Sequence, residues 1–205
     1  MPTVVHRHRG DDVTRSLFVT ATLALVAVAL PGYAQPRAID LKRSTVTVRV
    51  FKSGLFRAFA DDHVIEAPLA EGSLDDSGTP AVRIAIDERG MRVLDPGLSP
   101  NDRREVQTRM LGPEALDADR FPRIRFRSVA IQRGDADRWS VRGELELHGQ
   151  TRPVTVNVVR ELGHYKGSTS LKQSEFGITP ISLAGGTVRV KDEMKIDFDI
   201  VTTER

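Results

Sequence analysis

The sequence predicts an all-β protein built from mostly antiparallel strands, with one short helix. Three observations lead to this fold class. Apolar and polar residues alternate with a period of two in several segments, which is typical of half-buried strands. Short turn signals separate these segments, and the sequence lacks the strand–helix–strand alternation of a parallel sheet. Such strands form a closed barrel or a sandwich, and the alternation alone does not distinguish the two.

Eight or nine segments carry the strand pattern. The first runs over 45–51, where Val46, Val48 and Val50 share one face and threonine and arginine occupy the other. A weaker strand is expected over 65–74 and another around 82–86. Pro122 then blocks helix formation and begins a new strand. The later strands are expected at 123–128, 139–147, 151–161, 165–171 and 188–200.

One clear helix is expected over 100–111. Ser99 is a good N-cap, Pro100 sits at the first helical position, and Asp102 lies near the positive end of the helix dipole. Gly112 and the proline after it end the helix.

The strand after Pro122 indicates which face of the sheet is buried and which is exposed to water. Ile124 and Phe126 point one way, whereas three arginines, Arg123, Arg125 and Arg127, point the other way. An apolar stripe opposite an arginine stripe requires a curved sheet with an apolar inside and a hydrated outside. The carboxylates that alternate with apolar residues later in the chain fit the same outer face, rather than a paired acid and base: Glu144, Glu146, Asp197 and Asp199.

Residues 1–34 are expected to be a cleaved secretory signal peptide. Three arginines precede an apolar run over 17–30, and the small residues Gly32 and Ala34 occupy the positions expected before a cleavage site. The run of about 14 residues is short for a membrane anchor. The alternative is an uncleaved N-terminal membrane helix. The remainder, 37–205, reads as one domain without an internal repeat.

Composition excludes several kinds of function. The chain has no cysteine, so disulfides, cysteine metal sites and thiol nucleophiles are excluded. A net charge of +2 and an aromatic content of 5% give no indication of nucleic-acid binding. The nucleophile elbow of hydrolases and the glycine-rich phosphate loops are absent from the sequence. These absences disfavour an enzyme without disproving one.

Several motifs, in order and at consistent spacing, resemble the YceI family of small periplasmic and secreted proteins. The family pattern P-x-I-x-F-x-S is matched from Pro122 to Ser128, and Asp102-Arg103 matches the segment before it. Further matches lie on both sides, at 52–56 with Asp62-His63, at 143–154, at 176–178 and at 190–193. Together the matches span roughly residues 37–200.

The resemblance implies an eight-stranded antiparallel lipocalin-like barrel with one short helix packed beside it. It also implies a periplasmic or secreted carrier that holds a polyisoprenoid or similar long-chain amphiphile, without catalysis and with no cofactor other than that bound lipid. No stable membrane anchor is expected after cleavage. The oligomeric state stays open, a homodimer included.

The inward faces of the strands are therefore the candidate ligand site. The seven residues expected to point into the barrel are Val46, Val48, Val50, Phe126, Trp139, Val141 and Leu145. Phe56 and Phe59 would line the mouth, and Gly143 would leave room for a ligand. The alternative is that these side chains only fill a solid core, as in a structural or stress-related protein.

His63 is the first candidate for polar chemistry. It would contact a ligand head group, or it would be a loop histidine bonded to backbone. In a lipid- or quinone-modifying enzyme it would move a proton with Asp62 beside it. The family often has a second histidine where this chain has Asp61, which weakens a metal site based on a histidine pair. A zinc site from His63, His148 and His164 has no ligand spacing to support it.

Overall fold

The computed structural model describes residues 2–3, 36–53, 62–75, 80–183 and 188–203. The chain divides into two units, Met1–Gly32 and Tyr33–Arg205, and all described strands and helices belong to the second unit. Most of the expected signal peptide, together with Phe56 and Phe59, lies outside the described residues.

The described residues form twelve strands and one α-helix. The strands are β1 (Arg37–Ala38), β2 (Thr45–Ser53), β3 (His63–Glu66), β4 (Leu69–Asp75), β5 (Ala81–Asp87), β6 (Arg92–Val93), β7 (Arg123–Arg133), β8 (Arg138–Leu147), β9 (Gln150–Glu161), β10 (His164–Lys172), β11 (Ser182–Leu183) and β12 (Val188–Val201). The helix is α1 (Pro100–Leu111), and two 3-10 turns are η2 (Glu88–Gly90) and η3 (Gln173–Phe176). The all-β prediction is confirmed.

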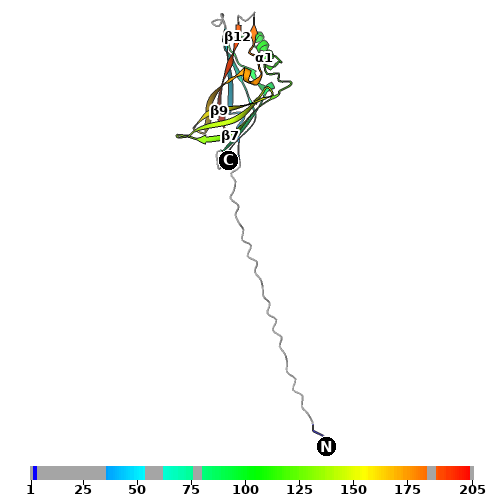
Figure 1. The fold of residues 1–205 in the computed structure, drawn as a ribbon, viewed down its shortest axis with the longest axis vertical. Helices are drawn as coiled ribbons and strands as arrows, with labels where there is room; N and C mark the ends of the chain where they lie inside the picture. The colour runs from blue at the N-terminus through cyan, green and yellow to red at the C-terminus, as the bar shows by residue number, and fades with distance from the viewer. Residues whose placement is uncertain (1, 4–35, 54–61, 76–79, 184–187, 204–205) are drawn as a thin grey trace. The chain divides into compact units, whose positions relative to one another are not determined.

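All strands belong to one antiparallel sheet that curls into a half-barrel (Figure 1). Neighbouring strands follow the order β1-β4-β5-β7-β8-β9-β10-β12-β2-β3-β6, with β11 paired to β12 off this path. β3 pairs with β2 and β4 pairs with β5, although only Ala67 and Pro68 separate β3 from β4 in the chain. This two-residue connection therefore joins β3 and β4, which lie near opposite ends of the strand order.

The expected count of eight strands is not matched. Three of the twelve strands, β1, β6 and β11, have only two residues and show no alternation in the sequence. In addition, the single strand expected over 65–74 is two strands. Pro68 stands in the gap between them, and proline has no N–H to donate to a strand ladder.

The helix has the bounds that the sequence predicts. Ser99 is its N-cap and accepts a hydrogen bond from the backbone N–H of Asp102 at 3.2 Å. Gln107 holds the helix to the edge strand β6, because its side chain accepts from Val93 N and donates to Met91 O, both at 2.8 Å. These bonds supply partners for the backbone of a strand that is only two residues long.

The outer face of the half-barrel carries cross-strand ion pairs. Arg125 on β7 pairs with Glu146 on β8 at 3.2 Å, and Arg49 on β2 pairs with Asp197 on β12 at 3.4 Å. The expectation of a hydrated outer face with alternating arginines and carboxylates is confirmed for these pairs. Each pair is substantially exposed, so its contribution to stability is small.

Candidate functional site

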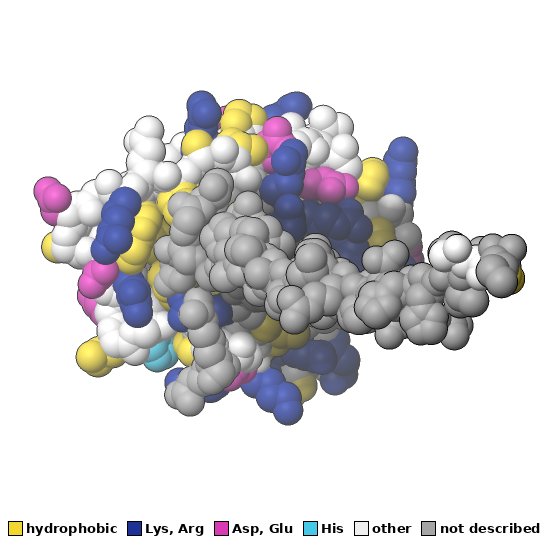
Figure 2. Space-filling model, turned by 90° about the horizontal axis from the view of Figure 1, so that it is seen from below, with side chains coloured by type: hydrophobic (Ala, Val, Ile, Leu, Met, Phe, Trp, Pro, Cys, Tyr) yellow, Lys and Arg dark blue, Asp and Glu magenta, His cyan; other side chains and the backbone are white. Residues whose placement is uncertain are grey.

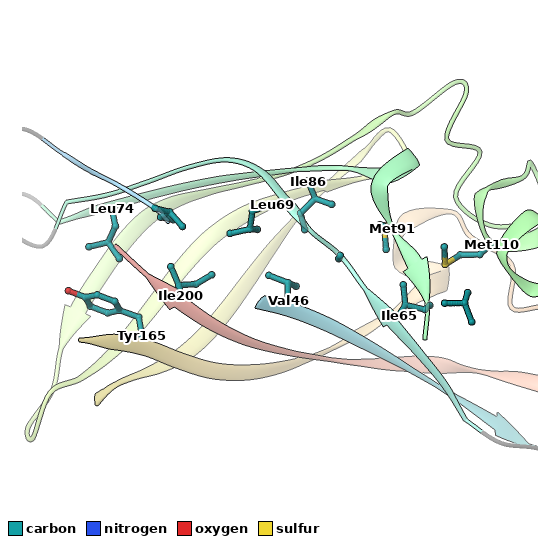
Figure 3. Packing of buried hydrophobic residues seen from close by; sticks show 12 residues of the cluster. Val46, Ile65, Leu69, Leu74, Ile86, Met91, Met110, Tyr165 and Ile200 are labelled. Carbon is teal, nitrogen blue, oxygen red and sulfur yellow. The ribbon is translucent and has the colours of Figure 1, made fainter. Parts of the chain in front are cut away.

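The inner face of the sheet is apolar along its whole length. Two clusters of buried hydrophobic residues share partly buried neighbours such as Val48, Val50 and Ile196. Figure 3 shows the larger cluster extending from Leu74 and Tyr165 at one end to Met110 of α1 at the other. The period-two alternation brings these side chains to one side of each strand.

The inner face encloses a cavity of about 280 Å³. This volume is close to the lower limit of about 300 Å³ for small-molecule sites and far exceeds the roughly 30 Å³ that one water occupies. The interior is therefore not packed solid. Among the described residues that line the cavity, Asp75 is the only charged one, and Thr169, Gln173 and Tyr165 add a few polar atoms.

Seven of the expected ligand-binding residues line this cavity. They are Val46, Val48, Val50, Phe126, Trp139, Val141 and Leu145. That they contact a ligand stays a prediction. His63 is not among the described lining residues, and Phe56 and Phe59 lie outside the described part of the chain.

Other lining residues were not in the expected set. Val154, Val156 and Val158 of β9 line the cavity, and their alternation was visible in the sequence. Met110 of α1 and Leu116 after it also line the cavity, so the helix and the segment after it form part of the wall. Only the tertiary fold brings these last two to the site, because nothing in their local pattern separates them from ordinary core residues.

Two strands contain irregularities that redirect side chains. The pairing of β7 with β8 shifts between Ser128 and Ala130, and Val129 is 48% exposed at this point. The inward series therefore continues at Ile131, which lines the cavity. The pairing of β12 with β2 shifts in the same way between Val190 and Met194. Such bulges change the face to which the following side chains point, and the apolar–polar alternation of the sequence does not reveal them.

Gly143 does not leave room for a ligand, contrary to expectation. A Cβ at this position would overlap the ring of Phe126 and lie 2.7 Å from Arg127 O. The space beside the glycine is therefore filled by the neighbouring strand's phenylalanine, and the expectation of local space was wrong.

His63 has a partner other than the one expected. Its Nδ1 lies 2.5 Å from Oδ2 of Asp95, a carboxylate that is only 2% exposed. The other oxygen of Asp95 accepts from Val64 N at 2.7 Å. Asp62, the sequence neighbour of His63, instead accepts from Lys52 N at 3.1 Å. The pair ties β3 to the segment before α1, which no local motif could predict.

The other two histidines considered for a zinc site, His148 and His164, are held at separate places. His148 Nδ1 lies 3.2 Å from Phe176 O and its ring is 4.7 Å from that of Phe121, whereas His164 Nδ1 lies 2.7 Å from Oδ1 of Asp199. Within the described ranges, no group of three potential metal ligands is close enough to hold an ion.

Glu88 is an unexpected buried acid. Its side chain is fully buried in η2, and neither carboxyl oxygen has a hydrogen-bond partner among the described residues. Burial, and then the negative charges of Asp117 and Asp87, raise the pKa of Glu88 to about 8. The group is therefore protonated at neutral pH. It is not among the described cavity-lining residues.

The sequence matches the YceI-like domain over residues 38–202. This range agrees with the span over which the motifs occur. No match is found among curated proteins. Where the structure describes the chain, no helix is long and apolar enough to cross a membrane.

The solved structures with a similar fold include two from bacteria. BcnA from Burkholderia cenocepacia has a TM-score of 0.60 and 21% identity, and the alignment covers 80% of this chain and 99% of that chain. A polyisoprenoid binding domain from Saccharophagus degradans, implicated in plant cell wall breakdown, has a TM-score of 0.54 and 14% identity, with 82% and 98% covered. At these identities, the likeness concerns the fold.

Proposed function

The chain belongs to the YceI-like domain family, and on that premise we propose that it binds and carries a long-chain amphiphile, such as a polyisoprenoid, without catalysing a reaction. The observation that carries the proposal is the elongated apolar cavity of about 280 Å³ inside the sheet. The fold likeness to the polyisoprenoid binding domain from Saccharophagus degradans supports the ligand class.

Burial of the chain supplies the binding free energy. Each methylene removed from water contributes about 0.8 kcal/mol, so a five-carbon isoprene unit contributes roughly 3 to 4 kcal/mol before costs. A flexible chain loses several kcal/mol when it is immobilised. Four buried units contribute roughly 12 to 16 kcal/mol before costs, which exceeds this loss, and each further unit adds to the surplus, so long chains are favoured over short ones.

The geometry gives no second candidate function. In the enzyme alternative, His63 and Asp62 would act together, but Asp62 bonds to Lys52 N and the partner of His63 is Asp95. His63 is also not among the described residues of the cavity wall, where a lipid or quinone would lie. A solid, non-binding core does not fit a cavity of this size.

We further propose that the carrier works in the periplasm or is secreted. The basic, apolar and small-residue segments of 1–34 support export. N-terminal sequencing of the protein isolated after expression in a bacterium is expected to start at or near Gln35. A start at Met1 would contradict cleavage.

Two measurements test the binding function. Organic extracts of the purified protein are expected to contain a prenyl lipid by mass spectrometry. Trp139 is the only tryptophan in the chain and lines the cavity, so its fluorescence should change when geranylgeraniol is added to delipidated protein. Protein that is empty after purification, and whose Trp139 emission does not respond to prenyl alcohols, would refute the proposal.

A further inference from the structure

The strands β9 and β10 are paired with each other over only part of their length. Their ladder starts at the turn that connects them and ends at the pair formed by Asn157 and Ser168. Both strands continue beyond this pair, because β9 stays paired to β8, and β10 to β12, as far as the other end of each strand. The wall of the half-barrel therefore contains a seam, formed by 153–156 of β9 and 169–172 of β10, across which no strand ladder runs.

A proline in β9 helps to explain why the ladder ends. Leu162 and Gly163 both have a positive φ, so they form a two-residue hairpin turn, and hydrogen-bonded pairs recur at every second residue from it. On this count, the odd-numbered residues of β9 direct their backbone N–H and C=O groups toward β10. Pro153 occupies one of these positions and has no N–H to donate. The proline therefore removes a hydrogen bond that a ladder across the seam would need.

The cavity lies directly behind the seam. Val154 and Val156 on one side of it, and Thr169 and Leu171 on the other, all line the cavity. Val154 also packs against the hydrophobic cluster that contains Leu171. The two sides of the seam are thus joined by apolar contacts instead of a ladder. Because such contacts are not directional, contacts with a prenyl chain can replace them.

The outer face of the seam is almost free of charge. Thr155 and Ser170 face outward beside it and are exposed, and Lys172 stands at its far end. Ion pairs join β7 to β8 and β2 to β12 across the outer face. Between the described residues of β9 and β10, the ion pair is that of Lys166 with Glu161, which lies near the turn and away from the seam. An uncharged chain that crosses the seam therefore breaks no ion pair between described residues.

The two ends of the cavity differ from the seam. At one end, Met110 of α1 and Leu116 after it form part of the wall. Figure 2 views the molecule from the side opposite to α1 and shows Lys, Arg, Asp and Glu side chains spread over that face. At the seam, by contrast, the neutral side chains of Thr155 and Ser170 lie outside and the apolar wall lies inside.

We propose that a prenyl chain enters and leaves the cavity sideways through this seam, by separation of β9 from β10. This inference rests on the proposed carrier function and adds the route of its ligand. The separation breaks side-chain contacts that the ligand itself replaces, while both strands keep their ladders to β8 and β12. Parts of a structure that few hydrogen bonds hold together open at a low free energy.

A cross-link across the seam tests the route. The chain has no cysteine, so Thr155→Cys with Ser170→Cys supplies the only two thiols, at positions that would be opposite each other if the ladder continued. A short bis-maleimide joins them, and Trp139 fluorescence in a stopped-flow instrument follows binding of geranylgeraniol and its release into phosphatidylcholine vesicles. Both rates are expected to fall by at least about tenfold on cross-linking. The Kd should change by less than about twofold, because a blocked route slows entry and exit alike.

The matched control places the same cross-link where the ladder is intact. Asn157→Cys with Ser168→Cys puts two exposed thiols on the same two strands, one ladder step away from the seam. This cross-link joins residues that are already paired, so both rates should equal those of the same variant before cross-linking.

Hydrogen exchange of the unmodified protein gives a test that needs no variant. The backbone N–H of Thr155 points toward the seam, whereas that of Asn157 takes part in the ladder. The amide of Thr155 is expected to exchange faster than that of Asn157. Equal protection of the two amides would overturn the proposal, because it would mean that β9 and β10 are joined along the seam.

The outcomes separate the route from the carrier function. Unchanged rates in the protein cross-linked at Thr155→Cys and Ser170→Cys overturn the seam as the route and leave the carrier function intact, since the chain then enters at an end of the cavity. Equal slowing by the control cross-link also overturns the route. Failure of the unmodified protein to bind geranylgeraniol overturns the carrier function and the route with it.

Discussion

The ring of Phe126 on β7 lies against the backbone of Gly143 on β8, where any Cβ would overlap ring atoms. The same arrangement occurs between β12 and β10, where the ring of Phe198 lies against Gly167. Both phenylalanines line the cavity. The two glycines therefore let large aromatic side chains lie flat along the wall instead of projecting across the hollow.

Gly143→Ala is expected to destabilise the protein by about 1–3 kcal/mol, since the added methyl forces Phe126 and the neighbouring backbone to move. Urea denaturation followed by circular dichroism measures the change. Gly134→Ala is the control, because its nearest contact would be at an ordinary 3.6 Å, and we expect its effect to stay within about 0.5 kcal/mol. Equal effects of the two substitutions would contradict the packing described here.

Val156→Trp is expected to reduce binding of geranylgeraniol by at least about tenfold, because a large side chain would occupy the space in which the prenyl chain lies. Thr155→Trp places the same side chain on the exposed outer face of the same strand and should leave binding unchanged. Equilibrium binding by calorimetry compares the two, and thermal unfolding shows whether each variant is folded. Normal binding by a folded Val156→Trp protein would mean that the ligand lies elsewhere.

Glu88 is expected to make stability depend on pH. The folded protein keeps the proton of this group to about pH 8, because burial raises its pKa, whereas the unfolded chain releases it near the ordinary value of 4.5. Unfolding therefore releases a proton between these pH values, and the contribution of Glu88 to the free energy of unfolding falls by about 1.4 kcal/mol per pH unit. This contribution is constant below about pH 4.5 and again above about pH 8.

Glu88→Gln removes this titration. The stability of the variant relative to the wild type should rise steadily as the pH increases from about 5 to 8, and then level off. Glu114→Gln, which removes a carboxylate from an exposed position, should show no such trend. Denaturation at a series of pH values measures both, and parallel curves for wild type and Glu88→Gln would contradict a buried, protonated Glu88.

Gln107→Ala is expected to destabilise the protein by roughly 1–3 kcal/mol, because it leaves Val93 N and Met91 O without their side-chain partner. Hydrogen exchange should show faster opening of α1 and β6 than of the long strands. Glu105→Ala removes only an exposed pair with Arg109 on the same helix and should cost about 0.5 kcal/mol or less. An unaltered exchange rate of α1 in Gln107→Ala would contradict the proposed attachment.

The long strands and the helix were predictable because their signals are local. Ser99 and Gly112 bound the helix within one segment of chain, and alternation identified the inward faces of β2, β8 and β9. For the same reason, seven expected residues are found on the cavity wall. Each of these features depends on neighbours within a few residues, so a single sequence is enough to predict it.

The features that were missed depend on pairs far apart in the chain. His63 bonds to Asp95 rather than to its neighbour Asp62. The space beside Gly143 is occupied by the ring of Phe126 rather than left open for a ligand. The bulge near Val129 reverses the inward series within β7, and alternation does not reveal it. The twelve-strand count also depends on pairing, because two-residue strands exist only through their partners.

The sequence by itself determined where most of the long strands run, which faces of these strands are apolar and where the helix begins and ends. Tertiary structure alone decided that the apolar faces enclose a hollow and that α1 and the segment after it complete the wall of this hollow. The physical reason is that alternation sets the direction of a side chain, whereas curvature and register set what it meets.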